Sequence, residues 1–453
     1  MSVKSKINIC GIYFYFFSGV ILYFWPNAFR QSGEVVIIVS IAFLMVFISW
    51  MRFDFLLQLR LIFFLAVGFA AGVAKLISPD MVLIDLGNNI QTYDVLIAMY
   101  SLSMIGGSSI MVGYILARKK YLKVSKTSLI TNGVAGDTSI YIFSLLLILA
   151  IGYLSARSYG PPIWEAAYSS GKGEGQALGL LQAFGIIFIG INFLTASHFN
   201  DKKIWLLSFS VYFYLLFVGI LIRGGRLEFL AGILALYYCQ KLIHVRPFEV
   251  RLRHYLLLGV AALFMEYGVG WLRYSLVLDD PESIFDAITR MYENKTLFLG
   301  TISGLSSSFA SLVHMIQNNV LEYGYGISYF EYILRTPPEF LYPERPADMS
   351  SVFDQYGYTT IGGFSEITEA YYNFGIFGAM IIPGVITYLF KRFLDKAYAG
   401  GFLNYVFIIS IISVFFRGAL YQTFAYYKAL IAGVIVYFLI IFWRAFIGIN
   451  IKK

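Results

Sequence analysis

The chain has 453 residues, of which 59% are hydrophobic and only 13% charged, and its formal net charge is +8. This composition excludes an ordinary soluble globular protein and indicates a polytopic membrane protein. The basic excess does not indicate nucleic-acid binding, because the lysines and arginines stand in short clusters beside apolar runs, a pattern typical of membrane topology. Cys10 and Cys239 both lie inside apolar runs and predict neither a disulfide nor a metal site.

Runs of about 17 to 25 mainly apolar residues can cross a bilayer, and the sequence contains about twelve of them. The first run lacks a small-residue cleavage site, so we expect a retained span and not a signal peptide. The fold class predicted is therefore all-α, a polytopic membrane protein with about twelve transmembrane helices. The predicted spans are 8–25, 35–51, 57–77, 93–117, 138–155, 178–197, 204–222, 227–243, 255–272, 374–390, 400–416 and 427–443.

Most of the 34 lysines and arginines fall in segments that are cytoplasmic if both termini are cytoplasmic. Arg52 and Arg60 are counted among these cytoplasmic charges. The positive-inside rule favours this orientation, which places the long polar segment after the ninth span outside the cytoplasm. No repeat or linker divides the chain, so residues 1–453 are expected to form a single integral membrane domain.

The polar segment 273–372 is predicted to be one large periplasmic loop, and we expect the chemistry there. Apolar residues recur at helical spacing within 284–292 and within 309–320, which predicts two amphipathic helices at the membrane surface. Pro337, Pro338, Pro343 and Pro346 follow, and they predict that no regular structure forms before the turn at Gly362.

Two arginines stand at the predicted outer edge of the membrane in the sequence Ile222-Arg-Gly-Gly-Arg-Leu-Glu228. Arg223 and Arg226 are joined by two glycines, which allow a tight turn and a close approach to a ligand. Guanidinium groups match phosphate oxygens in a planar fork, so this pair is a candidate pyrophosphate site. The alternative is that both side chains extend to lipid headgroups, with Glu228 as a local partner.

Four further residues are candidates for binding the substrate or its pyrophosphate. Arg273 and Arg417 stand at the outer ends of predicted spans, although extension to lipid headgroups also explains them. Arg290 follows Asp286 at a spacing of four, which favours a structural ion pair on a helix. Tyr372 lies in the segment that leads into the tenth span.

Glu366 and Glu369 are candidates for general base catalysis. Their spacing of three places both on one face of a helix, and one carboxylate could accept the proton of an attacking sugar hydroxyl. The alternative is that both acids complement the dipole at a helix start and face water. His314 is the single histidine in the predicted outer segments and no outer loop contains an Asp-x-Asp dyad, so no metal or other cofactor is expected.

The segment from Gly362 to Gly378, which reads GGFSEITEAYYNFGIFG, together with the earlier Arg-Gly-Gly-Arg, resembles the bacterial O-antigen or oligosaccharide repeat-unit polymerases called Wzy. The resemblance implies a membrane glycosyltransferase with a GT-C-like fold that acts on undecaprenyl-pyrophosphate-linked oligosaccharide at the periplasmic face of the bacterial inner membrane. It implies that Arg223 and Arg226 match arginines that open a span in that family. A chain-length regulator and a flippase are the implied partners, beside the lipid bilayer.

The resemblance implies a metal-independent, inverting glycosyl transfer between lipid-linked repeat units, as in lipopolysaccharide biosynthesis. Related O-antigen ligases carry a histidine about eleven residues before the glycine that opens the tenth span, where this chain has Phe364. This departure weakens the resemblance to a ligase, and a ligase or another lipid-phosphate-sugar glycosyltransferase remains the alternative enzyme. A lipid-linked glycan flippase is the alternative from another class, although such carriers need no long outer loop.

Overall fold

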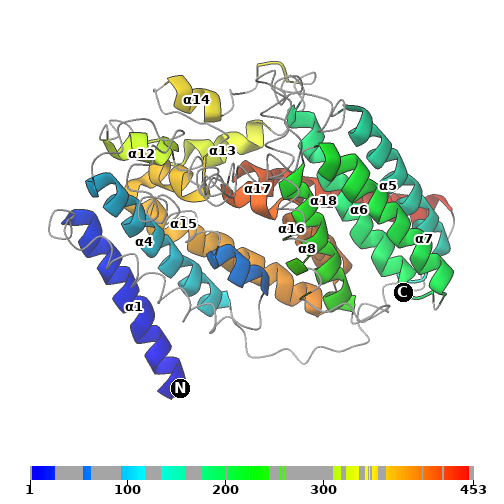
Figure 1. Cartoon of the computed structure of the whole chain (residues 1–453), viewed down its shortest axis with the longest axis horizontal. Coiled ribbons are helices and arrows are strands. Elements are labelled where there is room, and N and C mark those ends of the chain that lie inside the picture. The colour runs from blue at the N-terminus through cyan, green and yellow to red at the C-terminus, as the bar shows by residue number, and fades with distance from the viewer. Residues whose placement is uncertain are drawn as a thin grey trace, which may run out of the picture. The chain divides into compact units, whose positions relative to one another are not determined.

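The structure is a computed structural model of the chain. It describes residues 3–25, 55–62, 93–117, 134–158, 175–199, 201–223, 225–243, 310–317, 323–335, 342–344, 349–355, 364–399, 401–420 and 423–447, with a few single positions between 253 and 260 and at 346. Every regular element in these ranges is a helix (Figure 1). The prediction of an all-α protein is therefore confirmed for the described residues.

The described residues divide into two compact units, which we treat separately. The first unit comprises 1–119, 298–392 and 418–424, and the second comprises 120–297, 393–417 and 425–453. The first contains α1 (Val3–Phe24), α4 (Tyr93–Ala117), α12 (Ala310–Gln317), α13 (Ile327–Leu334), α14 (Met349–Gln355) and most of α15 (Glu366–Tyr398). The second contains α5 (Thr138–Ser158), α6 (Gly175–Ala196), α7 (Lys202–Phe213), the π-helix η5 (Tyr214–Ile220), the 3-10 turn η6 (Leu221–Arg223), α8 (Arg226–Ile243), α16 (Phe402–Ser413) and nearly all of α18 (Phe424–Phe446). The short α17 (Phe415–Leu420) contributes to both.

Five helical stretches among the described residues are long and apolar enough to cross a membrane. They are 100–117, 138–157, 202–220, 366–398 and 424–446, and each overlaps a span predicted from the sequence. The protein is therefore an all-α membrane protein. Predicted spans 35–51 and most of 57–77 and 255–272 lie outside the described residues, so the count of twelve stays a prediction.

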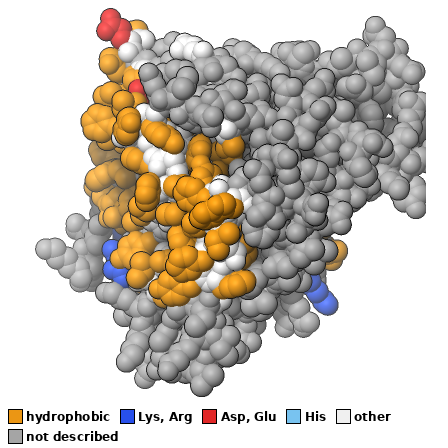
Figure 2. Space-filling model, turned by 90° about the vertical axis from the view of Figure 1, so that its left-hand side faces the viewer, with side chains coloured by type: hydrophobic (Ala, Val, Ile, Leu, Met, Phe, Trp, Pro, Cys, Tyr) orange, Lys and Arg blue, Asp and Glu red, His pale blue; other side chains and the backbone are white. Residues whose placement is uncertain are grey.

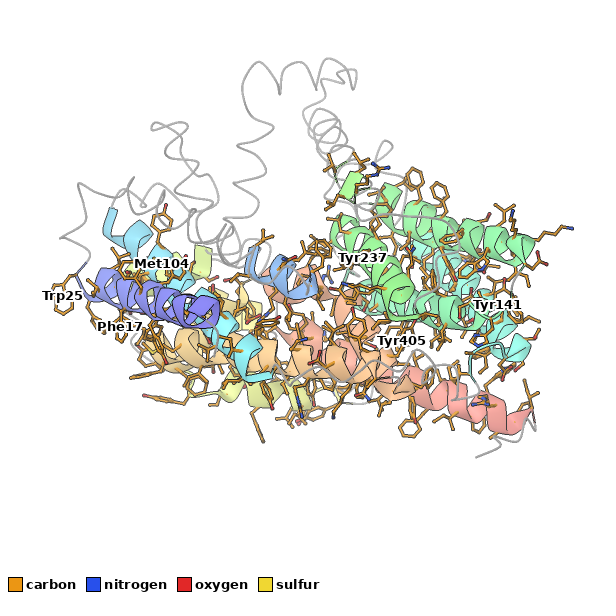
Figure 3. The ribbon with its side chains drawn as sticks, turned by 90° about the horizontal axis from the view of Figure 1, so that it is seen from below. Phe17, Trp25, Met104, Tyr141, Tyr237 and Tyr405 are labelled. Atoms are coloured by element: carbon orange, nitrogen blue, oxygen red, sulfur yellow. The ribbon has the colours of Figure 1, made fainter. Side chains whose placement is uncertain are left out.

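Large hydrophobic side chains cover the outer faces of these helices. On α1, Tyr13, Phe14 and Phe17 are each more than half exposed, and Figure 2 shows hydrophobic side chains gathered over the described part of one face. Figure 3 shows Trp25 pointing away from the helices, whereas Met104 of α4 is buried. An apolar surface of this kind is unfavourable in water and is the expected surface in lipid.

The second unit is held together by a buried polar network. The Asn192 side chain donates to the backbone oxygen of Tyr141 at 2.9 Å and accepts from the Tyr212 hydroxyl at 2.7 Å. The Tyr405 hydroxyl donates to the Gly190 backbone oxygen at 2.7 Å. These bonds join α5, α6, α7 and α16 within the apolar interior, where van der Waals packing and polar bonds replace the hydrophobic effect as the force between helices.

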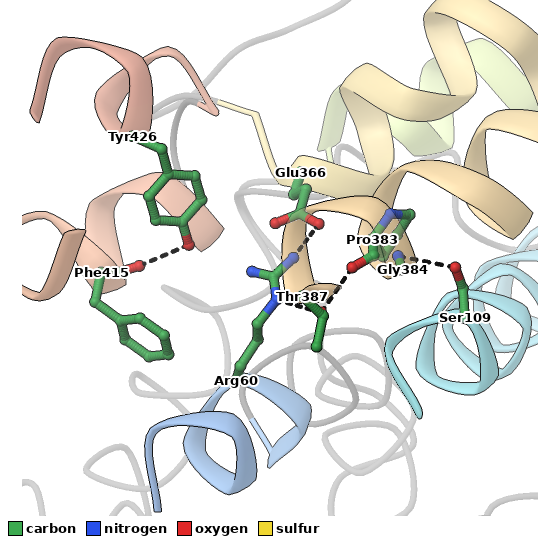
Figure 4. Close-up of polar contacts among 8 residues, drawn as sticks. All are labelled: Arg60, Ser109, Glu366, Pro383, Gly384, Thr387, Phe415 and Tyr426. Carbon is green, nitrogen blue, oxygen red and sulfur yellow. Dashed lines mark hydrogen bonds and ion pairs between the residues drawn. The ribbon is translucent and has the colours of Figure 1, made fainter. Parts of the chain in front are cut away.

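In the first unit, α4 and α15 approach each other through small residues. A Cβ atom on Gly113 would lie 2.1 Å from the Gly384 carbonyl oxygen, so neither position tolerates a larger residue without movement. The backbone N–H of Gly384 donates to the Ser109 hydroxyl at 2.9 Å (Figure 4). Ser109 and Gly113 stand four residues apart, which is the small-residue spacing that lets membrane helices pack closely.

Helix α15 is broken at Gly375, where φ is 58° and ψ is −142°. The two parts fold against each other, because a Cβ atom on Gly378 would lie 1.8 Å from the carbonyl oxygen of Ala370. Arg60 bonds both Glu366 and Thr387, two residues that a straight helix would hold roughly 30 Å apart. Residues 366–374 therefore form a short limb that runs back along the longer limb that follows the break.

The turn before α13 holds this break in place. The backbone N–H of Gly324 donates to the Tyr372 carbonyl at 3.0 Å, and that of Gly326 donates to Asn373 Oδ1 at 2.9 Å. Gly326 has φ 88°, and a Cβ atom there would lie 2.9 Å from the Phe374 ring. The glycines of both segments are therefore required by the contact between them.

Two predictions for the segment 273–372 can be compared with the structure. The predicted helix within 309–320 is confirmed as α12, with Leu312 and Met315 buried, whereas the predicted helix 284–292 lies outside the described residues. The expectation of no regular structure after Pro337 is wrong, because α14 spans Met349–Gln355. The last of these prolines is Pro346. After it, Met349 and Phe353 stand one helical turn apart and both are buried. Helix α13 is a further element that the sequence did not predict.

We expect Gly375→Ala to destabilise the protein by about 1–3 kcal/mol, because its backbone angles are almost restricted to glycine. The new methyl group would also lie 3.1 Å from the Tyr323 hydroxyl. The measurement is the temperature at which purified, detergent-solubilised protein loses its monodisperse peak. Gly11→Ala is the matched control, since nothing lies within 4 Å of a Cβ atom there. Equal melting of the two variants would contradict the described break.

Candidate functional site

The start of α15 carries both predicted acids on one turn. The Ser365 hydroxyl accepts from the Thr368 backbone N–H at 3.3 Å and lies 2.7 Å from the Thr368 hydroxyl, an arrangement that caps the helix. Glu366 and Glu369 occupy the first turn, where negative charge complements the helix dipole. The alternative that these acids face water is wrong, because both side chains are fully buried.

Glu366 forms a buried ion pair with Arg60, which lies on the helical segment 55–62 (Figure 4). The second contact of Arg60 is from Nε to the Thr387 hydroxyl at 3.0 Å, and that hydroxyl donates in turn to the Pro383 carbonyl at 2.7 Å. The guanidinium also lies over the Phe390 ring, 5.3 Å from its centroid. Arg60 thus ties the two limbs of α15 together.

Arg60 is a residue whose role the sequence analysis missed. It is counted there as a cytoplasmic charge, yet it is 1% exposed and paired with a carboxylate 306 positions away. The reason is that its charge is balanced inside the protein and not by water or lipid headgroups. One signal was available: Arg60 falls within the predicted span 57–77, and an ionisable residue inside a span is a functional candidate by default.

Glu369 is held by two hydroxyl groups from α13. Its Oε1 atom accepts from the Ser328 hydroxyl at 2.6 Å and from the Tyr332 hydroxyl. The Asn373 side chain donates to Ser328 Oγ at 2.7 Å and thereby directs the serine hydrogen toward the carboxylate. The Oε2 atom of Glu369 has no hydrogen-bond partner of normal geometry among the described residues. One carboxylate oxygen is thus fixed by two hydroxyl groups, and the other is buried near Thr423 without a hydrogen bond of normal geometry.

The tyrosines of α13 remain protonated donors. Burial raises the pKa of the Tyr332 phenol well above its ordinary value, and the neighbouring charge of Glu369 raises it further. The pKa of Tyr329 is raised by burial and then by the charges of Glu369 and Glu366. Both phenols therefore keep their protons throughout the physiological pH range, and Tyr332 can donate to Glu369 at any such pH.

Arg223 and Arg226 lie in the second unit, at the junction of two helical elements. Arg223 ends the 3-10 turn η6 and Arg226 begins α8. The Gly225 N–H donates to the Ile220 carbonyl at 3.0 Å, and a Cβ atom on Gly225 would approach the Ile220 side chain to 2.8 Å. Gly225 is therefore closely packed against Ile220, while the two arginine side chains lie outside the described part of the structure.

A π-helical segment, η5, leads directly into this turn. π-Helical turns are rare and often occur at functional sites, because they shift the register of the helix that follows. Gly152 of α5 makes room for the segment, since a Cβ atom there would lie 2.8 Å from the Tyr214 ring. The backbone on which Arg223 stands is therefore set by an irregular helix that the apolar sequence pattern does not indicate.

Arg417 lies in the second unit and pairs with Glu228, with Nε 3.1 Å from Oε1. The sequence analysis gave Glu228 as a local partner of Arg223 and Arg226. Among the described side chains Glu228 pairs with Arg417, and its contact with Arg223 or Arg226 stays a prediction, because those two side chains lie outside the described part. The arginine remains 41% exposed, so it keeps one accessible side, although its charge is partly balanced.

The other predicted residues do not join these clusters in the described structure. Arg273 and Arg290 lie outside the described residues. Tyr372 is buried, with its ring 4.9 Å from that of Phe353, and its backbone holds the turn before α13. Its part in substrate binding stays a prediction. Among the described residues there is no group of three or more histidine, cysteine, aspartate or glutamate side chains that could hold a metal ion.

Comparison of the chain with protein-family models, with curated proteins and with solved structures found no match. Function must therefore be inferred from the residues themselves. The acidic pair belongs to the first unit and the arginine turn to the second.

Removing Arg60 alone should lower the stability of the protein more than removing both Arg60 and the charge of Glu366. We expect Arg60→Met to cost about 3–5 kcal/mol, because it leaves the Glu366 carboxylate buried without its counter-ion. Adding Glu366→Gln in the same protein should restore part of the loss, since the uncompensated charge is then gone. The melting temperatures of the two single variants and the double variant measure this coupling. Strictly additive losses would contradict the ion pair.

Proposed function

We propose that the protein is a membrane glycosyltransferase that joins undecaprenyl-pyrophosphate-linked oligosaccharide units into a surface polysaccharide. In this proposal it has a GT-C-like fold of about twelve spans, lies in the bacterial inner membrane with both termini cytoplasmic, and acts at the periplasmic face. The observation that carries the proposal is Glu369, a buried carboxylate in an apolar helical protein, with one oxygen fixed and the other without a partner among the described residues. Ionisable groups in such surroundings are costly and are usually kept for function.

In the proposed reaction, a hydroxyl of the incoming lipid-linked unit attacks the anomeric carbon of the growing chain. A new carbon–oxygen bond forms as the bond to the pyrophosphate oxygen breaks, and the pyrophosphate leaves with that electron pair. The attacking hydroxyl gives its proton to Glu369, and in-line displacement inverts the linkage. We favour Glu369 over Glu366 as the base, because protonating Glu366 would leave the buried charge of Arg60 without its partner.

The proposal assigns the leaving pyrophosphate to Arg223 and Arg226. Two guanidiniums offer several N–H donors in a planar arrangement that matches phosphate oxygens. Pyrophosphate is already a good leaving group, so fixed positive charge can stabilise it without a metal ion. Arg417 is a secondary candidate because it keeps an exposed side.

A flippase for the same lipid-linked glycan is the second candidate, and two observations favour it. Transporters commonly use helices that are broken within the membrane, and they keep charged groups at depth. The break of α15 at Gly375 and the buried pair of Arg60 and Glu366 have both properties. A carrier does not require a carboxylate with basic character, however, which separates the two functions by experiment.

The deciding experiment is a deletion strain complemented with variants, with its surface glycan separated on a gel. Glu369→Gln should leave a single capped repeat unit, because it keeps the side-chain size and removes the base. Glu344→Gln, at an exposed position of the loop, is the matched control and should restore long polymer. A deletion strain with no repeat outside the cell would show a flippase, and free polymer without attachment would show a ligase. Long polymer with Glu369→Gln would remove this residue as the base.

Arg223→Ala and Arg226→Ala should each abolish long polymer while the protein stays in the membrane at normal levels. Lysine at either position should recover little, because it keeps the charge and loses the two-pronged geometry. Arg157→Ala, at an exposed arginine near the end of α5, is the control.

Purified protein should also elongate its substrate in excess EDTA. Wild-type polymer from either arginine variant, or activity restored only by magnesium or manganese, would contradict this assignment.

A further inference from the structure

Four buried polar atoms on α13, on α15 and at Arg335 lack hydrogen-bond partners among the described residues. They are Oε2 of Glu366, Oε2 of Glu369, the Tyr329 hydroxyl and Nε of Arg335. Buried polar atoms are nearly always hydrogen-bonded in folded proteins, so a group of unpaired ones needs an explanation. Glu366 and Glu369 are fully buried and Arg335 is only 5% exposed, whereas Tyr329 is partly exposed.

The four atoms belong to one neighbourhood. The charges of Glu366 and Glu369 both interact with the Tyr329 phenol, and the charge of Arg335 interacts with Glu369. Between them, the Tyr332 hydroxyl bonds Glu369, and the Tyr329 and Tyr332 rings lie 6.0 Å apart. All four lie in the first unit, on α13, on α15 and at Arg335, which directly follows α13. Thr423 approaches Glu369 as well, without a hydrogen bond of normal geometry.

We propose that these atoms bind the hydroxyl groups of an uncharged sugar ring in the lipid-linked oligosaccharide. A carboxylate oxygen only accepts hydrogen bonds and a guanidinium N–H only donates them, whereas a phenol does both. Each sugar hydroxyl can donate and accept, so a sugar ring offers a partner of the right kind to every atom of this mixed set. The Tyr332 ring is stacked on Phe424 with centroids 4.6 Å apart, which supplies an aromatic wall beside the polar atoms.

The charges around the site select against acidic sugars. Arg60 balances Glu366, and Arg335 is already paired with Glu331. No salt bridge to Glu369 is found among the described residues. A uronic acid ring would bring a second carboxylate close to Glu369 in a buried place, where like charges repel strongly. A neutral hexose or deoxyhexose meets no such repulsion.

This inference rests on the proposed function only in assigning the sugar to a lipid-linked unit. Binding of the ring needs no transfer reaction, and a flippase would need it equally. Sugar binding and polymer formation can therefore fail independently.

The test is saturation-transfer NMR on the full-length protein in a detergent that carries no sugar. The probes are methyl glycosides of glucose, galactose, mannose and rhamnose, with the methyl glycosides of glucuronic and galacturonic acid as charged counterparts. At least one neutral probe should receive saturation and neither acidic probe should. Tyr329→Phe should lower the affinity for the neutral probe roughly five-fold, which is the effect of one lost hydrogen bond.

Two controls keep the result interpretable. Tyr325→Phe removes the same hydroxyl from a residue that is 78% exposed in the preceding turn, and it should bind like the wild type. Tyr329→Phe should not lower the melting temperature, because the hydroxyl it removes has no partner within the described structure. Absence of binding by every neutral probe, equal binding of a uronide, or unchanged affinity in Tyr329→Phe would overturn the inference. Binding that behaves as expected in a protein that never elongates its substrate would leave it standing and would remove the polymerase proposal alone.

Discussion

A charge buried away from water must find an opposite charge, and the pair of Arg60 and Glu366 shows how much of the first unit depends on that constraint. The guanidinium reaches a carboxylate at the start of one limb of α15 and a hydroxyl on the other limb, Thr387. The guanidinium therefore bridges the two limbs of α15. Glu369, one turn further along, is thereby presented to α13.

The sequence Asn373-Phe-Gly375 connects this architecture to the chemistry. Asn373 accepts from the backbone of Gly326 and donates to Ser328, so the same side chain closes the turn before α13 and orients a donor to Glu369. Gly375 allows the chain to reverse where no other residue would be unstrained. Asn373 and Gly375 thus determine both the backbone reversal and the hydrogen bonding of Glu369. A substitution in the turn before α13 would therefore alter the surroundings of the candidate base.

Much of the helical framework could be predicted, because an apolar run long enough to cross a bilayer has few other structures available. The acids at the start of α15 were also found by their spacing. The reversal at Gly375 was not, since apolar residues continue on both sides of it and hydropathy does not record direction. The partner of Arg60 was beyond reach for another reason: an ion pair across 306 positions leaves no local pattern. Helix α14 was not predicted, because four prolines stand just before it and its only apolar signal is the pair Met349 and Phe353.

The wide separation of Arg60 and Glu366 along the chain also bears on how the protein is made. Ribosomes release residues in order, so Arg60 must enter the membrane long before its carboxylate partner exists. An arginine at the centre of an inserting helix costs about 2.5–3.5 kcal/mol, and Arg60, near the start of the predicted span 57–77, carries a smaller cost of the same kind. The charge of Arg60 therefore has no carboxylate partner at Glu366 until that part of the chain has been synthesised. Assembly of the first unit then becomes a late event, completed only when the C-terminal third of the chain has been synthesised.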